Sequence, residues 1–467
     1  MLFTSNFYLL YLPVVLFLYY RLQPRGRRLM LLGASWLFYM LYNPWFMWLI
    51  LATTSVDWIA GRGVSSTEDP ARRRWWVVAS VVSNMGMLVY FKYSTFALDN
   101  LNLLGHVVSP QLAALAWHGA LPLGISFHTF QGISYVVDVY RKETKPVASF
   151  FEFALFVSFF PQLVAGPIVR APEFIPQVKF TSNADPSMFW KGIARVIFGM
   201  FKKVYVADAI SPWVSDAYAD PTRFSGASLL LATVAFTVQI YCDFSGYSDI
   251  AIGLAALFGI KLPENFKAPY LSTSIREFWQ RWHMTLSRWL RDYLYIPLGG
   301  NRKGELRTYV NLMITMVLGG LWHGAGWNWM VWGAIQGLVM SLERLTGLDR
   351  TPQSGVARFF RWLTTMIVVL VSWIFFRARS FGQATLILGR IVHWSPGVIH
   401  TESRSAVFAL GGLALILVAE LLDLKQRFTN WFDTRQTALR WIVYACVAAF
   451  AVTFSRAPNQ EFIYFAF

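Results

Sequence analysis

Apolar residues occur along this chain in separate runs, each of a length that suits a buried or membrane-spanning helix. The runs cover residues 7–20, 29–42, 45–60, 75–90, 229–240, 308–321, 327–342, 362–376, 407–421 and 441–454. A helix that spans a bilayer needs roughly 20 residues, or fewer where the membrane thins or the helix ends are polar. Because several runs are shorter, we expect tilted, broken or partly buried helices, about eleven of which reach membrane depth. The pattern predicts an all-α integral membrane protein.

The composition supports a chain whose solvent is largely lipid. Of the 467 residues 56% are apolar and only 14% are charged, and the mean hydropathy is +0.44. Soluble globular domains have about 25% charged residues. The polar stretches between the runs are too short to bury a core of their own, so we predict that residues 1–467 form a single membrane domain.

Positive charge is concentrated between the apolar runs. The net charge of +16 would suit a nucleic-acid-binding protein, but the basic stretches are RLQPRGRR (21–28), ARRR (71–74) and RKETK (141–145). Lys and Arg accumulate in the cytoplasmic loops of membrane proteins. We therefore expect these three loops to face the cytosol and the N-terminus to lie outside, and we expect no nucleic-acid partner.

Two apolar segments contain residues that interrupt helices. FFPQLVAGPIVR (159–170) contains two prolines and a glycine, and YCDFSGYSDIAIG (241–253) contains Asp243, Ser245, Gly246 and Asp249. Non-helical backbone at membrane depth is tolerated only where it is buried in protein or lines a wet cavity. Both segments are predicted to be irregular and to border an internal chamber.

Acids within an apolar segment need partners. For Asp243 and Asp249 we expect ion pairs with Lys202 or Lys203. The functional alternative is that Asp243 supports the site by orienting a histidine.

The segment 274–302 has the period of an amphipathic helix. Its apolar residues recur at intervals of three and four and fall on one face: Ile275, Phe278, Trp279, Trp282, Leu286, Trp289, Leu290 and Tyr293. Arg281, Arg288 and Arg291 fall on the other face. Residues 261–307 contain nine Lys and Arg against four Asp and Glu, which favours the cytosolic interface. There the helix could attract the phosphates of a donor or simply anchor to anionic lipid.

His323 stands apart from the other histidines because of its setting, GGLWHGAGWNW (319–329), between two apolar runs. An ionisable side chain at this depth is costly unless it has a function or a partner, and imidazole is the usual general base near neutral pH. The neighbouring small residues are expected to leave room for a substrate or for a partner's side chain to approach. The alternative is a neutral histidine bonded to a backbone carbonyl. His283, beside Trp279 and Trp282, is interpreted as an interfacial histidine.

Other common site signatures are absent from the sequence. It contains no GxSxG motif, no Gly-rich phosphate loop and no zinc-ligand spacing. We predict no metal and no permanently bound cofactor.

Four motifs and the terminal hexapeptide resemble the membrane-bound O-acyltransferase (MBOAT) family, in its bacterial branch. They are FFPQLVAGPIVR (159–170), YCDFSGYSDIAIG (241–253), FWQRWHMTLSRWLRDYLYIPLGGNRKG (278–304), LWHGAGWNW (321–329) and FIYFAF (462–467). That branch contains the membrane subunit of alginate O-acetylation and relatives in cellulose acetylation and teichoic acid D-alanylation. The motifs occur in the order typical of the family.

The resemblance implies a ring of about eleven transmembrane helices around a thin central channel, with interfacial and re-entrant helices. It implies that His323 is the catalytic histidine and His283 the second motif position. It further implies a multi-pass protein of the bacterial inner membrane that takes acetyl from cytosolic acetyl-CoA. The expected recipient is a periplasmic SGNH-type acetyltransferase that modifies an exopolysaccharide.

On this basis each candidate residue has an expected role. His323 would act as the general base toward an acceptor hydroxyl. Arg281, Arg288 and Arg291 would hold acetyl-CoA, and Trp322 or Asn328 would stabilise the oxyanion. Further expected partners are membrane lipid and a polysaccharide synthase or secretion complex.

Three alternatives remain open from the residues. Intramembrane His and Asp would also suit a non-catalytic transporter or flippase of a polysaccharide system. Other branches of the family acylate lipids or proteins, and a scaffold would need no catalytic histidine. The sequence does not decide whether the polymer is alginate, cellulose or another polysaccharide.

Overall fold

The protein is helical throughout the part of the chain that the computed structural model describes. The described residues are 6–103, 116–119, 121–179, 185–352, 354–399, 403–442, 445 and 463. Within them there is no strand, only one isolated parallel bridge between Phe224 and Val398. The all-α prediction is confirmed for this part. The apolar run 441–454 and the motif 462–467 lie largely outside it.

The chain divides into two compact units. Unit 1 comprises residues 1–196, 250–263 and 436–459, and unit 2 comprises residues 197–249, 264–435 and 460–467. Two of the boundaries fall within helices, α11 (Pro186–Met200) and α13 (Gly226–Leu257). No polar linker is found at these two boundaries.

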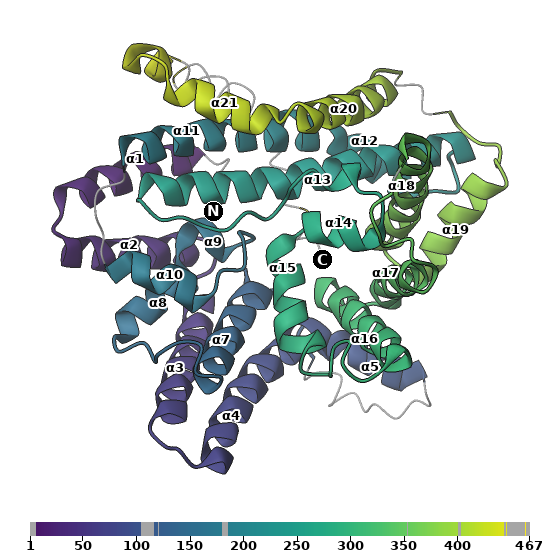
Figure 1. Ribbon diagram of the computed structural model, residues 1–467. Helices are drawn as coiled ribbons and strands as arrows, with labels where there is room; N and C mark the ends of the chain where they lie inside the picture. Colours follow the sequence, from purple (N-terminus) through teal and green to yellow (C-terminus); the bar gives the residue numbers. More distant parts are fainter. Residues whose placement is uncertain are drawn as a thin grey trace. The chain divides into compact units, whose positions relative to one another are not determined.

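Unit 1 is built from helices of the first 200 residues (Figure 1). Its elements are α1 (Asn6–Arg21), α2 (Pro24–Met40), α3 (Phe46–Ser65), α4 (Pro70–Leu88), η1 (Val89–Tyr93), α5 (Ser94–Leu103), α7 (Ile125–Tyr140), α8 (Phe150–Ser158), α9 (Phe160–Leu163), α10 (Ala171–Lys179) and most of α11. Helix α3 packs against α4 and α7, and α2 packs against α1 and α8.

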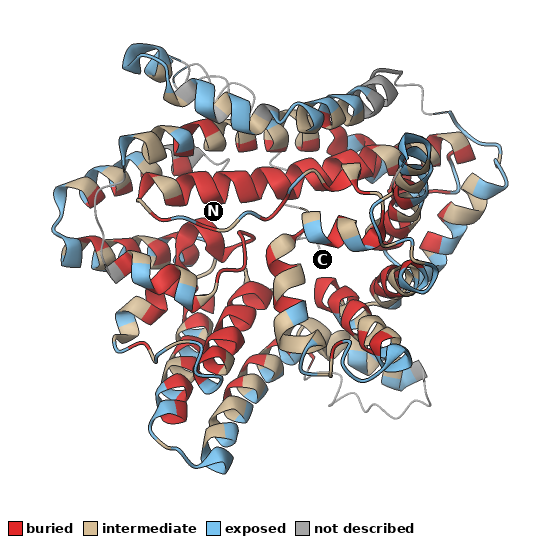
Figure 2. Ribbon diagram, in the orientation of Figure 1, coloured by how far each residue is buried: buried red, intermediate tan, exposed pale blue. Residues whose placement is uncertain are grey.

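Unit 2 contains the longest helices. Its elements are η2 (Phe201–Ala207), α12 (Asp208–Ala219), most of α13, η3 (Pro269–Leu271), α14 (Ile275–Arg281), α15 (Met284–Leu290), η4 (Arg291–Tyr295), α16 (Glu305–His323), α17 (Trp327–Thr346), α18 (Gly355–Arg377), α19 (Phe381–Val392), α20 (Ser403–Leu421) and α21 (Leu424–Asp433). Among described helices, α13 and α18 are long and apolar enough to cross a membrane by length and composition. Figure 2 shows α13 buried along nearly its whole length.

The segment 159–170 is irregular, as predicted. Phe159 has an extended ψ of 112° and separates α8 from α9. The backbone N–H of Phe160 donates to the hydroxyl of Ser35 at 3.1 Å, and the Gln162 amide donates to the carbonyl of Phe156 at 2.7 Å. Side chains therefore satisfy backbone groups that the helix break would leave without partners.

The prediction of an irregular segment at 241–253 is wrong, because these residues continue α13 without a break. Glycines here allow close packing of helices. A Cβ on Gly246 would lie 2.8 Å from the carbonyl oxygen of Gly199, and one on Gly253 would lie 2.6 Å from that of Gly192. Small residues let helix backbones approach closely. The glycines in this segment therefore mark a helix contact, and their interpretation as helix breakers was wrong.

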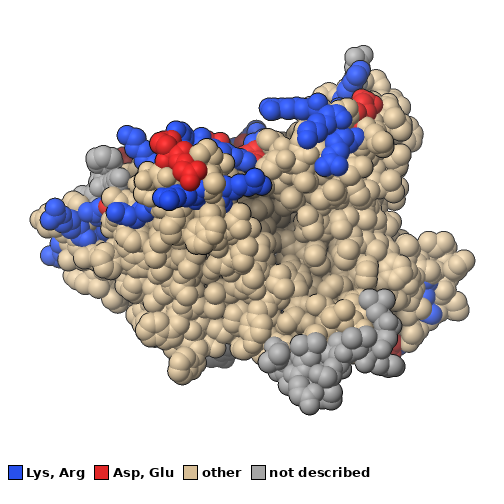
Figure 3. All heavy atoms as spheres, turned by 90° about the horizontal axis from the view of Figure 1, so that it is seen from below, with Lys and Arg blue, Asp and Glu red and all other residues tan. Residues whose placement is uncertain are grey.

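The three basic loops lie at one end of unit 1. Arg73 donates to the carbonyl of Tyr140 at 2.8 Å, Arg62 donates to the carbonyl of Ala148 at 3.3 Å, and Arg28 pairs with Glu152. Figure 3 shows Lys and Arg in groups on the surface, beside areas with few charges. The common end agrees with a single side of a membrane, and the compartment stays a prediction.

Candidate active site

His323 is the last residue of α16, and four aromatic rings surround its imidazole. The side chain is 4% exposed. Its ring centroid lies 4.9 Å from that of Trp322, 5.1 Å from Trp332, 5.4 Å from Phe376 and 6.4 Å from Trp329. These rings come from α16, α17 and α18, so three helices fix the orientation of the imidazole.

The glycines around His323 serve helix packing. Of the two expected uses of the space, the approach of a side chain is the one found beside Gly324, where the Trp329 indole lies, and backbone lies beside Gly320. A Cβ on Gly320 would lie 2.2 Å from the carbonyl oxygen of Trp329, and one on Gly324 would lie 2.3 Å from the Trp329 indole. Across the same crossing, a Cβ on Gly333 would lie 2.2 Å from the carbonyl oxygen of Met316. The missing side chains let α16 and α17 approach closely and hold His323 at their junction.

Asn328 anchors this junction to α18. Its amide nitrogen donates to the carbonyl oxygens of Phe375 and Ala378, at 3.3 and 2.8 Å. An amide NH₂ group has two hydrogens, so both are engaged at the end of α18. In this arrangement Asn328 is a positioning residue, and its donors are not directed at an oxyanion.

The segment predicted as one amphipathic helix over 274–302 is broken, and that prediction is wrong. α14 ends at Arg281, Trp282 is extended, and His283 has a φ of 41° before α15 begins. The first N–H groups of α15 bond outside the helix, Met284 to the carbonyl oxygen of Asn265 at 2.9 Å and Thr285 to its Oδ1 at 3.2 Å. A residue from a distant loop therefore replaces the preceding helical turn.

The apolar positions of this segment are nevertheless buried almost throughout. Seven of the eight are buried and Tyr293 is half-buried. At the start of α14, the Ser274 hydroxyl accepts from the N–H of Glu277 at 3.0 Å. The Glu343 carboxylate of α17 accepts from the N–H groups of Ile275 and Arg276, at 2.6 and 3.1 Å. These bonds satisfy the free N–H groups of α14 and tie it to α17.

The break places His283 in the core of unit 2. Its side chain is fully buried, so the interpretation as an interfacial histidine is wrong. The ring lies 4.7 Å from Phe244 of α13, 6.2 Å from Trp322 and 6.4 Å from His323, measured between centroids. Two histidines that are 40 positions apart in sequence thus lie side by side in one aromatic environment.

Two of the three arginines assigned to the donor form ion pairs with a nearby residue of their own segment. Arg281 pairs with Glu277 at 2.7 Å within α14, and Arg291 pairs with Asp292 at 2.6 Å while staying largely exposed. Burial alone would raise the pKa of Glu277, but bonds from Thr273 and the charge of Arg281 bring it below its usual value. Arg288 lies half-buried on α15.

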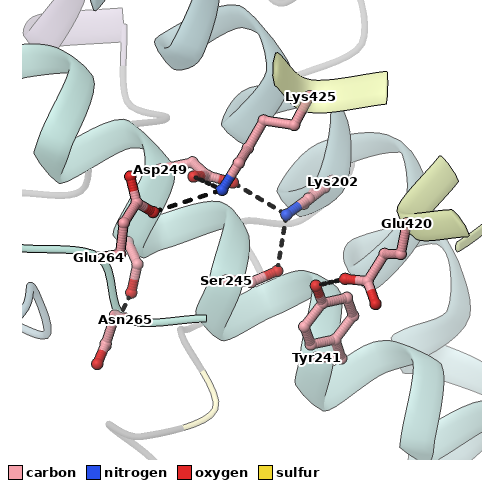
Figure 4. A network of polar contacts seen from close by, with 9 residues as sticks. Lys202, Tyr241, Ser245, Asp249, Glu264, Asn265, Glu420 and Lys425 are labelled. Carbon is pink, nitrogen blue, oxygen red and sulfur yellow. Dashed lines mark hydrogen bonds and ion pairs between the residues drawn. The ribbon is translucent and has the colours of Figure 1, made fainter. Parts of the chain in front are cut away.

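Charged side chains inside unit 2 form ion pairs. Lys202 contacts Asp249 at 2.9 Å and Ser245 at 3.0 Å, and Lys425 of α21 lies 3.6 Å from Asp249 and 3.5 Å from Glu264 (Figure 4). This network joins η2, α13 and α21.

A second group of charges confirms the expected pairing of Asp243. Lys203 lies 2.5 Å from Asp243 and 2.8 Å from Asp208, and Asp243 also accepts from the backbone N–H of Ile463 at 2.9 Å. Asp243 therefore links η2, α13 and Ile463.

Comparison with known proteins assigns the chain to a family. Residues 140–382, which include both histidines, match the family described as MBOAT, membrane-bound O-acyltransferase family. A Pseudomonas aeruginosa protein named "Probable alginate O-acetylase AlgI" is 42% identical over 441 residues, covering 93% of this chain and 84% of the relative. The chain belongs to the membrane-bound O-acyltransferase family.

Two further proteins are similar to this chain. A peptidoglycan O-acetyltransferase of Helicobacter pylori is 36% identical, over 83% of this chain and 79% of its own length. A teichoic acid D-alanyltransferase of Bacillus subtilis is 28% identical, over 47% of this chain and 58% of its own length. Membership confirms the resemblance drawn from the motifs, and the chain is an O-acyltransferase.

Within this MBOAT site, two residues were missed by the sequence reasoning. Asn265 bonds to His283 at 3.1 Å, and Glu343 accepts from the first N–H groups of α14. Asn265 lies in a loop without a recognised motif, and Glu343 resembles an ordinary charge at the end of a helix. The Ser274-x-x-Glu277 spacing, typical of a capping box, agrees with the helix start that the sequence predicted at 274.

Proposed function

We propose that this O-acyltransferase moves acetyl groups from cytosolic acetyl-CoA across the bacterial inner membrane, for O-acetylation of an exopolysaccharide such as alginate or cellulose. The observation that carries the proposal is the buried pair His283 and His323, with ring centroids 6.4 Å apart. The names of the Pseudomonas aeruginosa and Helicobacter pylori relatives, an alginate O-acetylase and a peptidoglycan O-acetyltransferase, support acetyl as the group and a polysaccharide as its destination.

In this mechanism His323 is the general base. Its imidazole takes the proton of an acceptor hydroxyl, the oxygen attacks the thioester carbonyl carbon, and the C–S bond breaks. The imidazolium then returns the proton to the departing CoA thiolate, which leaves an ester and free CoA. A thioester is already activated, so the protein contributes alignment and stabilisation of the oxyanion. Trp322 is the candidate oxyanion donor. Its ring centroid lies 4.9 Å from that of His323 and 6.2 Å from that of His283.

The surroundings of the site follow from the same proposal. A ring of about eleven spanning helices around a thin channel would let acetyl-CoA reach His323 from the cytosol and the acceptor hydroxyl reach it from the periplasm. Arg281, Arg288 and Arg291 would hold acetyl-CoA at the cytosolic face. A periplasmic SGNH-type acetyltransferase would receive the acetyl group, beside a polysaccharide synthase or secretion complex.

A transfer assay with labelled donor tests the proposal. Inverted membrane vesicles that contain the protein and its polymer-forming system receive radiolabelled acetyl-CoA, and free CoA and polymer-bound label are measured. We expect His323→Ala to abolish both signals while the amount of inserted protein is unchanged. His393→Ala, which removes an exposed histidine after α19, is the matched control. Full transfer by His323→Ala would remove this residue from the mechanism.

A further inference from the structure

Asn265 connects the polar face of α13 to the break before α15. Its side chain is 1% exposed. Its amide nitrogen donates to Ser248 at 3.2 Å, and its Oδ1 receives the hydroxyl of Thr285 at 2.9 Å and the backbone N–H of Thr285 at 3.2 Å. The same Oδ1 lies 3.1 Å from Nδ1 of His283.

These contacts determine which ring nitrogen of His283 carries hydrogen. A backbone N–H can only donate, so the Asn265 atom that faces Thr285 is the oxygen and not the amide nitrogen. An amide oxygen has no hydrogen to give. The hydrogen between Asn265 and His283 therefore belongs to Nδ1 of the histidine.

We propose that Asn265 is a positioning residue that holds neutral His283 in the tautomer protonated at Nδ1. The lone pair is then at Nε2, on the side of the ring away from Asn265. His283 thus enters the site beside His323 as a hydrogen-bond or proton acceptor, and in its neutral form it cannot donate to a developing oxyanion from Nε2. This role for His283 rests on the proposed function, whereas the tautomer does not.

Nitrogen NMR of the intact protein tests the tautomer directly. Protein labelled with ¹⁵N-histidine is studied in lipid at a pH where imidazole is neutral, and His283→Gln identifies the signals of residue 283. We expect Nδ1 to show the shift of a protonated nitrogen and Nε2 that of an unprotonated one. The reverse assignment in the wild-type protein overturns the proposal, and this experiment does not depend on any variant of Asn265.

A substitution tests whether Asn265 sets this state. Asn265→Leu removes Oδ1 but keeps a similar volume and the carbonyl that Met284 uses. We expect the second tautomer to appear at His283 and acetyl transfer to fall at least about tenfold, as when a partner that orients a histidine is lost. An unchanged His283 spectrum in Asn265→Leu would contradict the proposal.

Asn311→Leu is the matched control, because Asn311 is a buried Asn of unit 2 that bonds to the carbonyl of Gly300 at 2.9 Å. Its His283 nitrogen shifts should equal those of the wild type. Loss of the Nδ1-protonated signal in this variant as well would show general disturbance and overturn the role of Asn265. If Nδ1 is protonated but neither the wild type nor any variant transfers acetyl, the proposed function is wrong and the proposed tautomer is still supported.

Discussion

Lys203 lies between two carboxylates on different helices, Asp208 of α12 and Asp243 of α13. All three side chains are largely removed from solvent. Isolated buried charge is far more costly than a buried pair, and this is why intramembrane acids could be assigned a lysine from sequence alone. The choice of Lys203 for Asp243 and Lys202 for Asp249 depends on which side of η2 each lysine occupies.

Removing Lys203 should destabilise the protein strongly, because two buried acids lose their cation. Lys203→Met is expected to lower the free energy of unfolding by about 3–5 kcal/mol, which thermal unfolding in detergent would show as a lower Tm. The double variant Lys203→Met/Asp243→Asn should regain part of this loss. Lys303→Met, at an exposed position, is the control. Equal Tm values for Lys203→Met and the control would contradict a stabilising pair.

At the scale of elements, one pattern had two structural outcomes. The period-3.6 pattern over 274–302 correctly marked the buried face, yet the segment forms two helices with a break at Trp282 and His283. Periodicity indicates which side chains are buried. It does not reveal a two-residue break when the apolar faces of the two helices stay aligned. Conversely, the glycine and the acids within 241–253 suggested a break, but α13 is continuous there. These residues make contacts with a neighbouring helix instead.

The crossing of α16 and α17 should tolerate no side chain at Gly333. Its Cβ would lie 2.2 Å from the carbonyl oxygen of Met316, and backbone atoms cannot move aside cheaply. We expect Gly333→Ala to cost about 1–3 kcal/mol and to reduce acetyl transfer, because His323 ends α16. Unfolding and transfer are measured together. In the control Gly389→Ala, on α19, a Cβ meets nothing within 4 Å, and the helix should gain slightly. Unaltered stability and transfer in Gly333→Ala would refute the close crossing.

At the scale of the whole molecule, the orientation in the membrane follows from the basic loops. Single cysteines at Arg25, Arg72 and Lys142, in a chain without Cys242 and Cys446, should react with an impermeant maleimide only from the cytosolic side. A cysteine at Tyr42, at the far end of α2, should react only from outside. Labelling of the cysteines at positions 25, 72 or 142 in intact cells would contradict the predicted orientation.

The sequence by itself determined the properties that depend on local order. The apolar runs indicate helices, the basic loops indicate a common end, and the motifs around His283 and His323 indicate the family. Each of these signals lies within a segment of a few turns, where residue type and spacing carry the information.

Only the tertiary structure decided how distant segments complete one another. The break before α15 is stable because Asn265, from another loop, accepts the N–H groups of Met284 and Thr285. The same residue bonds to His283, and Asn328 uses both of its hydrogens at the end of α18. A hydrogen-bond partner is chosen by proximity in space, and spacing along the chain does not encode it.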